Sequence, residues 1–183
     1  MSFSNTVTEA RPQQLVASAR DLANETGSAA FTVAQVTERS GLSLKAFYQS
    51  FESKDDLLLA LLREDTKIGT EVLAERIGPK TGTEAVHAYV TELFALLTIP
   101  GALGYAGVLV REYLRLVEHH EKELTEALRP LTDLLARHLN TAQKERDALT
   151  MFGVLLGGIH EVVVGRTANP EYLFNFCMHG VGQ

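Results

Sequence analysis

The stretch "GLSLKAFYQSF", residues 41–51, decides how the amino-terminal part of this chain folds. Gly41 suits the end of one short helix, and Ser43 suits the cap of the next. Phe47 and Phe51 stand four residues apart, so in a helix both rings reach the same side. We therefore expect two short helices joined by a tight turn, with both rings facing inward.

The residues before this turn complete a three-helix unit. Residues 14–25 place apolar side chains at three- and four-residue steps, and Gly27 suits the end of that helix. Thr32, followed three positions later by Gln35, has the form of a capping box for a helix of barely two turns. Three short helices, the second and third joined by a Ser-Gly-Leu-Ser turn, form a helix-turn-helix by their spacing alone.

The third helix also carries polar groups on the side away from its two rings. This outer and amino-terminal side is the part of a recognition helix that meets base edges in a major groove. The spacing predicts that five residues lie there, namely Ser43, Lys45, Ala46, Tyr48 and Gln49.

The remainder of the chain is predicted to be helical as well. Ser53 followed by Asp56 has the form of a capping box that opens a helix reaching about residue 76. Pro130 is expected to kink or split the helix that contains it. No strand-length alternation and no repeat occurs, so the fold class is all-α with nine helices. The last five are expected at about residues 83–97, 106–118, 121–139, 145–166 and 170–179.

Composition and charge limit the class of protein. The 183 residues are 45% hydrophobic and 22% charged, as in ordinary folded, helix-rich proteins. Because the start of the chain has neither a basic region nor an apolar region of a secretion signal, we expect a cytoplasmic protein. The most apolar stretch, residues 148–160, is too short to span a bilayer. The single cysteine, Cys177, is interpreted as a small buried hydrophobe.

The net charge of −6 argues at first against a nucleic-acid partner, which usually binds a basic protein. Residues 1–54 nevertheless carry five cations and five anions, so the remaining 12 cations and 18 anions account for the whole deficit. An acidic body behind a neutral amino-terminal part would orient that part toward a polyanion. The charge distribution therefore permits DNA binding without requiring it.

Over residues 11–62 the chain resembles the TetR family of transcriptional regulators. The resemblance rests on "ARDLANETG", Phe31-Thr32-Val33, "VTERSGLS", the Phe47-Tyr48 pair, Phe51 and "SKDDLLLALL". It implies a DNA-binding head, which we place at residues 1–52, and a helical body for effector binding and dimerisation at residues 53–183. Beyond residue 62 the likeness is limited to the number and length of helices.

Carried over position by position, the resemblance implies two kinds of DNA contact. Phosphates would be bound by Thr32 and Ser43 at two helix starts, and by Lys54 at the start of the fourth helix. Tyr48 would also reach the DNA, and the side chains nearest the bases would be Lys45, Ala46 and Gln49.

Ordinary structural roles exist for several of these residues. Tyr48 could be a half-buried amphipathic side chain, and Lys54 could pair in solvent with acids of its own helix. Thr32 and Ser43 are helix caps in either case. The family commonly has a small residue in place of Lys45 and leucine in place of Phe47, so the operator sequence cannot be taken from a relative.

Residues 148–164 are apolar nearly all the way round the predicted helix, whereas a surface helix of a monomer should show a polar face. Gly153, Gly157 and Gly158 would let another helix approach closely. We therefore expect a two-fold homodimer through the eighth and ninth helices, with a central core helix of a monomer as the alternative. Two recognition helices about 34 to 36 Å apart would reach successive major grooves, so the operator is expected to be palindromic double-stranded DNA.

The resemblance also implies a small-molecule effector bound in the middle of the body, whose binding would move the fourth helix. The sequence does not identify this ligand, and each large aromatic side chain there belongs more often to a core than to a pocket. Further polar candidates are His87 and Glu112. The main candidates for effector binding are Tyr89, Phe94, Tyr105, Arg111, Tyr113, Met151, Phe152 and His160.

Two other classes of function compete with this interpretation. Glu84 and His87 form one Glu-x-x-His pair, but a di-iron bundle needs two such pairs and two further carboxylates. No phosphate-binding glycine loop or nucleophile elbow occurs, so we expect no catalytic residue, metal or cofactor. A helical interaction module without DNA binding is the alternative, and it would leave the polar side of the third helix unexplained. The favoured function is a ligand-responsive DNA-binding regulator, more often a repressor than an activator in such a family.

Overall fold

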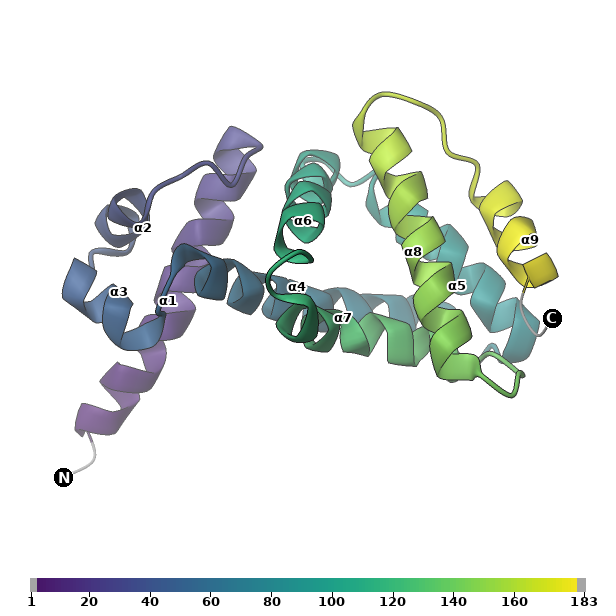
Figure 1. Cartoon of the computed structure of the whole chain (residues 1–183), viewed down its shortest axis with the longest axis horizontal. Coiled ribbons are helices and arrows are strands. Elements are labelled where there is room, and N and C mark those ends of the chain that lie inside the picture. The colour runs from purple at the N-terminus through teal and green to yellow at the C-terminus, as the bar shows by residue number, and fades with distance from the viewer. Residues whose placement is uncertain (1–2, 181–183) are drawn as a thin grey trace.

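The computed structural model describes the backbone of residues 3–180 and the side chains of residues 11–180. This part of the chain forms nine helices and no strand, which confirms the all-α prediction (Figure 1). The helices are α1 (Phe3–Thr26), α2 (Val33–Ser40), α3 (Leu44–Ser50), α4 (Lys54–Ile77), α5 (Gly82–Leu96), α6 (Ala102–Leu116), α7 (Glu121–Ala136), α8 (Lys144–Val163) and α9 (Pro170–Gly180).

The local signals of helix starts and ends are confirmed at the head. Thr32 and Ser53 form capping boxes with Gln35 and Asp56, as their three-residue spacing predicts. The helix α2 ends at Gly41, whose φ of 68° lies in the left-handed region that favours glycine.

Two prolines lie inside helices, contrary to what sequence favours. The helix α1 begins at Phe3 rather than at residue 14, so it contains Pro12. Pro130 does not split α7, which runs from Glu121 to Ala136 as one helix. A proline removes one backbone hydrogen bond. In α7 the loss is offset by packing, because residues on both sides of Pro130, such as Leu124 and Leu135, are buried.

The long helix α4 connects the two ends of the molecule. It contacts α1 of the head as well as α5 and α7. Figure 1 shows α1, α2 and α3 at one end, α5, α8 and α9 at the other, and α6 and α7 between them. The head and the body are therefore joined by one continuous helix as well as by side-chain contacts.

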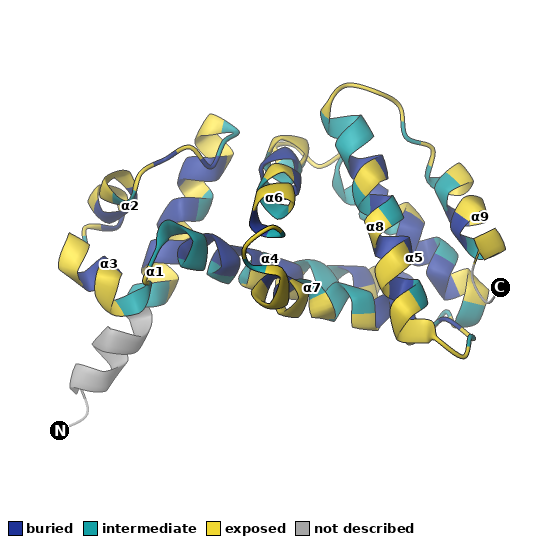
Figure 2. Ribbon diagram, in the orientation of Figure 1, coloured by how far each residue is buried: buried dark blue, intermediate teal, exposed yellow. Residues whose placement is uncertain are grey.

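The buried residues, dark blue in Figure 2, include two hydrophobic clusters. One cluster combines Phe47 of the head with Leu57 of α4 and Leu116 of α6. The other combines Tyr89 of α5 with Leu155 of α8 and further residues of α4, α7 and α9. Because the first cluster continues past residue 52, the division at 52 and 53 stays a prediction. Within the described residues, no helix has a stretch both long and apolar enough to cross a bilayer.

Candidate nucleic-acid interface

The helix α3 is anchored to the head by Phe47, as its spacing predicts. The Phe47 side chain is fully buried against α1 and α4, and its ring centroid lies 5.7 Å from that of Phe51. Phe51 follows the last turn of α3 as its C-cap and is half-buried, so it supports the helix end from just outside it. A buried ring at the centre of a seven-residue helix fixes which side of that helix faces solvent.

The turn between α2 and α3 is closed by short-range hydrogen bonds. The backbone N–H of Leu42 donates to the carbonyl of Thr37 at 3.0 Å, and that of Gly41 donates to Glu38 at 3.2 Å. The Ser43 hydroxyl oxygen accepts from the backbone N–H of Ala46 at 3.1 Å, which confirms its role as a cap. The turn therefore sets the angle between the two helices from residues close in sequence.

Contacts between distant residues hold α2 against α1. The side-chain amide of Gln14 donates to the carbonyl of Ser40 at 2.7 Å. The guanidinium of Arg39 makes two 2.7 Å hydrogen bonds to Glu25 near the end of α1. These bonds orient α2, and the turn then orients α3.

The outward side of α3 is polar, as expected for four of the five predicted residues. Ser43, Lys45 and Gln49 are exposed, and Tyr48 is 60% exposed while the edge of its ring packs on Phe47. Sequence reasoning missed Leu44, which is 51% exposed at the first position of α3. Its three-residue spacing from Phe47 favours an inward position, so no sequence signal marked it.

The expected outward position of Ala46 is wrong. Its side chain is only 7% exposed. Successive residues of an α-helix are rotated by about 100°, so the buried side that accommodates Phe47 also takes in its neighbour. The polar outward surface of α3 is therefore made by Ser43, Lys45, Tyr48 and Gln49 without Ala46.

Lys54, at the first position of α4, points back toward the head. Its ammonium donates a hydrogen bond to the carbonyl of Ala29 and lies 4.8 Å from the centroid of the Phe31 ring. Partial burial lowers the pKa of Lys54, because desolvation disfavours the charged form. The Lys54 ammonium is therefore bound within the head. It does not pair in solvent with acids of its own helix, and it is not directed outward toward a phosphate.

Thr32 is exposed at the start of α2, but its polar groups already have partners. The hydroxyl oxygen accepts from the backbone N–H of Gln35 at 3.2 Å, and the backbone N–H of Thr32 donates to the Gln35 side chain at 2.8 Å. The cap of α2 is thus formed by Thr32 and Gln35 within the protein itself.

The effector candidates do not converge on one cavity. Tyr89, Phe94 and Met151 are buried in the cluster of the body, and the Tyr89 hydroxyl donates to the carbonyl of Leu131 at 3.3 Å. Burial raises the pKa of Tyr89. Phe152 is also buried, at 3% exposure. All four side chains are buried in the structure.

The other four candidates lie elsewhere. Tyr105 and Tyr113 pack against the cluster of the head, and the Tyr105 hydroxyl donates to Asp65. Arg111 donates to the carbonyl of Gly27 at 2.7 Å. The ring Nδ1 of His160 on α8 is buried without a hydrogen-bond partner in the described part of the chain.

A hollow of about 350 Å³ lies between α8 and α9, away from most of these candidates. Its lining is mainly apolar, and Met151 is the only predicted effector residue in it. The residues that line it are Asp147, Thr150, Met151, Val154, Phe176, Cys177, His179 and Gly180.

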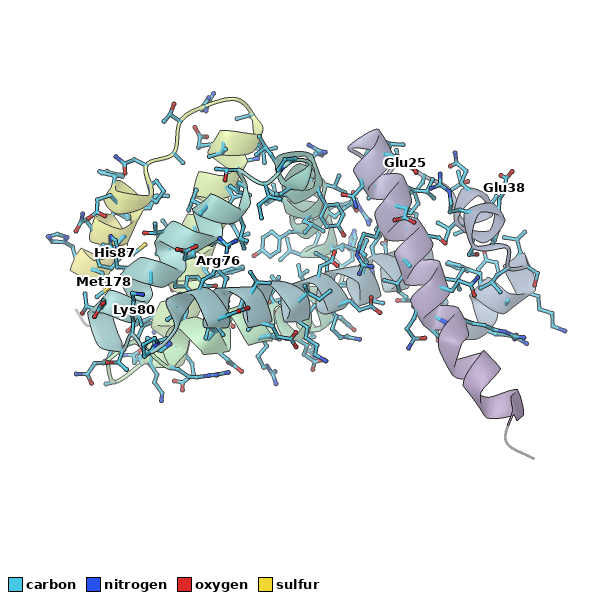
Figure 3. All side chains as sticks on the ribbon, turned by 180° about the vertical axis from the view of Figure 1, so that it is seen from behind. Glu25, Glu38, Arg76, Lys80, His87 and Met178 are labelled. Carbon is cyan, nitrogen blue, oxygen red and sulfur yellow. The ribbon has the colours of Figure 1, made fainter. Side chains whose placement is uncertain are left out.

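The Glu84 and His87 pair does not form a metal site in the described chain. His87, labelled in Figure 3, instead contacts α9. Its Nε2 lies 2.6 Å from a carboxylate oxygen of Glu171, and its ring is edge-on to that of Phe174. No group of three or more histidine, cysteine, aspartate or glutamate side chains within residues 11–180 is arranged to hold a metal ion.

Residues 15–61, which form the head and the start of α4, match the family model of bacterial regulatory proteins of the TetR family. These residues therefore carry a DNA-binding domain of the TetR family type. The match supports a DNA-binding transcriptional regulator.

Solved structures share the fold over nearly the whole chain. A TetR transcriptional regulator from Rhodococcus sp. RHA1 aligns with a TM-score of 0.70 at 17% identity, covering 93% of this chain and 94% of that one. The reduced form of E. coli NemR aligns with a TM-score of 0.67 at 16% identity, covering 92% and 95%. FadR from Bacillus subtilis in complex with stearoyl-CoA aligns with a TM-score of 0.65 at 19% identity, covering 91% and 95%. At these identities the likeness shows the fold alone, and no curated protein sequence matches the chain.

Proposed function

We propose that this protein is a homodimeric repressor, released from a palindromic operator by a small-molecule effector. The observation that carries the proposal is the outward side of α3, where Lys45, Tyr48 and Gln49 are exposed while Phe47 is fully buried. The polar groups of these three side chains face solvent, so they are free to bind a partner. It is proposed to act in the cytoplasm as a regulator and not as an enzyme.

The proposed DNA contacts divide into those that position and those that read sequence. Thr32 and Ser43 lie exposed at the starts of α2 and α3, where hydroxyl groups suit phosphate oxygens. Lys45 and Gln49 suit base edges, because lysine binds guanine acceptors and glutamine binds the donor and acceptor of adenine. Tyr48 lies between them. Ala46 and Lys54 are left out of this surface, since one is buried and the other is bound to Ala29.

The proposed dimer interface is the exposed apolar side of α8 and α9. Leu149 on α8 is 54% exposed, and Tyr172 and Phe176 on α9 are exposed with their rings stacked 6.3 Å apart. A Cβ added at Gly153 or Gly157 would have no atom within 4 Å, so both glycines face open space. An apolar helix side with outward glycines supports close approach of a second copy.

Gly158 has a different role from the other two glycines. An added Cβ there would lie 2.5 Å from Leu173 of α9 and 2.9 Å from Phe94 of α5. This glycine packs the helices of one protomer together, so only two of the three predicted glycines support the dimer.

The effector is proposed from the family pattern and is not identified. Its support from the relatives is limited to FadR of Bacillus subtilis, whose structure contains stearoyl-CoA. The mainly apolar hollow between α8 and α9 is one place where a small molecule fits, although a second copy bound to the same helices would also cover it.

Selection of bound sequences from a random duplex pool tests this function most directly. Enrichment of an inverted repeat is expected, whereas no enrichment would favour the interaction module without DNA binding. Tyr48→Ala and Gln49→Ala should then weaken binding to the selected duplex without changing the circular dichroism spectrum. Lys67→Ala, at an exposed position on α4, is the matched control and should leave binding unchanged.

A further inference from the structure

Three polar side chains of α6 contact the head and α4 at separate points. Arg111 donates to the carbonyl of Gly27 at the end of α1, at 2.7 Å. The Tyr105 hydroxyl donates to Asp65 in the middle of α4. Arg115 binds Asp55 in the first turn of α4. We call these three side chains and their partners the α6 latch.

The contact of Tyr105 extends through Asp65 to the head. Arg20 of α1 donates its Nε to the same carboxylate at 2.8 Å, and its Nη2 binds Glu64 at 3.1 Å. Asp65 is well covered, with 13% of its side chain exposed. One carboxylate therefore joins α1, α4 and α6. Its hydrogen bonds depend on direction, so they fix how the three helices are rotated relative to one another.

The contact of Arg111 holds the segment that leads from α1 to α2. Gly27 follows the last residue of α1 and has a φ of 61°. Carbonyls at a helix end lack partners within the helix and carry partial negative charge, so a guanidinium suits them. In the same segment the carbonyl of Ala29 accepts from Lys54. Two cations from α6 and α4 thus hold two carbonyls that lie two residues apart.

The contact of Arg115 is a two-point pair with Asp55. Its Nη2 lies 2.6 Å and its Nη1 3.0 Å from the two carboxylate oxygens, and its Nε donates to Glu112 at 2.8 Å. These bonds hold the pKa of Asp55 below its usual value. His120, just before α7, has its Nε2 3.5 Å from the same carboxylate. The start of α4 therefore contacts both α6 and the segment between α6 and α7.

Stability alone does not account for these contacts. The apolar cluster beneath them, which includes Val108 and Leu116 of α6, already joins α6 to the head. Apolar burial is non-directional, and partly exposed ion pairs contribute little to stability. Three directional contacts at different points restrain rotation in a way that apolar packing does not.

We propose that the α6 latch sets the orientation of the head on the body, so that a dimer presents its two recognition helices at one fixed spacing. This inference rests on the proposed function, because orientation matters only when two heads bind one operator. Tyr105, Arg111 and Arg115 are positioning residues. They are proposed to touch no DNA and to act through the end of α1 and through α4.

A distance measurement tests the latch without DNA. Spin labels at Glu38 on α2 and Glu126 on α7, both exposed, report the separation of head and body in a Cys177→Ala background. Labelled chains are diluted with unlabelled chains, so that only distances within one protomer are observed. The combined change Tyr105→Phe, Arg111→Gln and Arg115→Gln should broaden the distance distribution.

The matched control for this measurement is Arg166→Gln. Its pair with Glu161 lies in the body, at the end of α8 and far from the head along the chain. The control should keep the narrow distribution of the parent protein. A latch variant with an unchanged narrow distribution would overturn the proposal.

A DNA measurement then tests the consequence for spacing. Duplexes carry the selected half-sites at the preferred separation or shifted by about one or two base pairs. The latch variant should lose about fivefold or more of the parent's preference for one separation, while its affinity for a single half-site is unchanged. Equal weakening on every duplex, including the single half-site, would show a structural role only and overturn the proposal. If the parent binds no duplex, the proposed function fails, and the label distances alone decide the orientation of the head.

Discussion

Replacing Lys54 with alanine distinguishes a phosphate contact from a structural contact within the protein. In the structure the ammonium donates to the carbonyl of Ala29 and lies over the Phe31 ring. A hydrogen bond from a charged group contributes about 1.5 to 3 kcal/mol, and a cation–π contact at a partly exposed site about 0.5 to 1 kcal/mol. Because Lys54 is only half-buried, the lower part of the combined range applies. We expect Lys54→Ala to lower the free energy of unfolding by about 2 kcal/mol.

Urea unfolding followed by circular dichroism measures this loss. With a slope of about 1 to 3 kcal/mol per molar urea, the midpoint should fall by roughly 1 M. Lys45→Ala is the matched control, because Lys45 is exposed on α3. A surface substitution of this kind should change the free energy of unfolding by no more than about 0.5 kcal/mol.

Binding to the selected duplex at several salt concentrations completes the test. Each phosphate contact contributes about 0.9 to the slope of log affinity against log salt. If Lys54 acts within the protein, Lys54→Ala should leave the slope unchanged. A slope reduced by about 2 per dimer, together with an unchanged unfolding midpoint, would refute the internal role and restore the phosphate contact.

Three further changes test other parts of the structure. Phe47→Ala removes a fully buried ring and should cost about 3 to 5 kcal/mol of stability in urea unfolding; a loss below about 1 kcal/mol would contradict its role as an anchor. Gly157→Leu should yield monomers in analytical ultracentrifugation without unfolding, because an added side chain meets open space within one protomer, whereas Gly69→Leu, equally open on α4, should stay dimeric. Asp55→Asn should remove part of the loss of folding stability at low pH. Arg115 lowers the pKa of Asp55 in the folded state, so this carboxylate stabilises the protein fully above its unfolded pKa of about 3.9 and loses that effect as pH falls through the folded value. Thermal unfolding between about pH 6 and 3 should show a shallower decline for the variant, and parallel declines would exclude the effect.

The sequence was sufficient for features that depend on neighbouring residues. The capping boxes at Thr32 and Ser53, the turn at Gly41 and the inward ring of Phe47 all follow from groups within four positions of one another. Helix ends are governed by such local hydrogen bonds, so their signals are present in short stretches. The number of helices was predictable for the same reason.

The effector candidates show where sequence was insufficient. Tyr89 and Phe94 have the same size and spacing whether they line a cavity or fill a core, and the structure places both in the core. Arg111 and Tyr105 carry polar groups that suit a ligand, yet their partners are Gly27 and Asp65 of the same chain. The chemistry of a side chain limits which groups it can bind. The packing of the helices decides which of those groups lies within hydrogen-bond distance.

The sequence by itself therefore determined the nine helices, the helix-turn-helix and most of its outward polar side. Only the tertiary structure decided that Ala46 is buried and that Lys54 reaches Ala29, 25 residues away. It also decided that Arg111 meets Gly27 across 84 residues. The physical reason is one of range: backbone caps and turns are formed by nearby residues, whereas burial and ion pairing depend on which helices pack together.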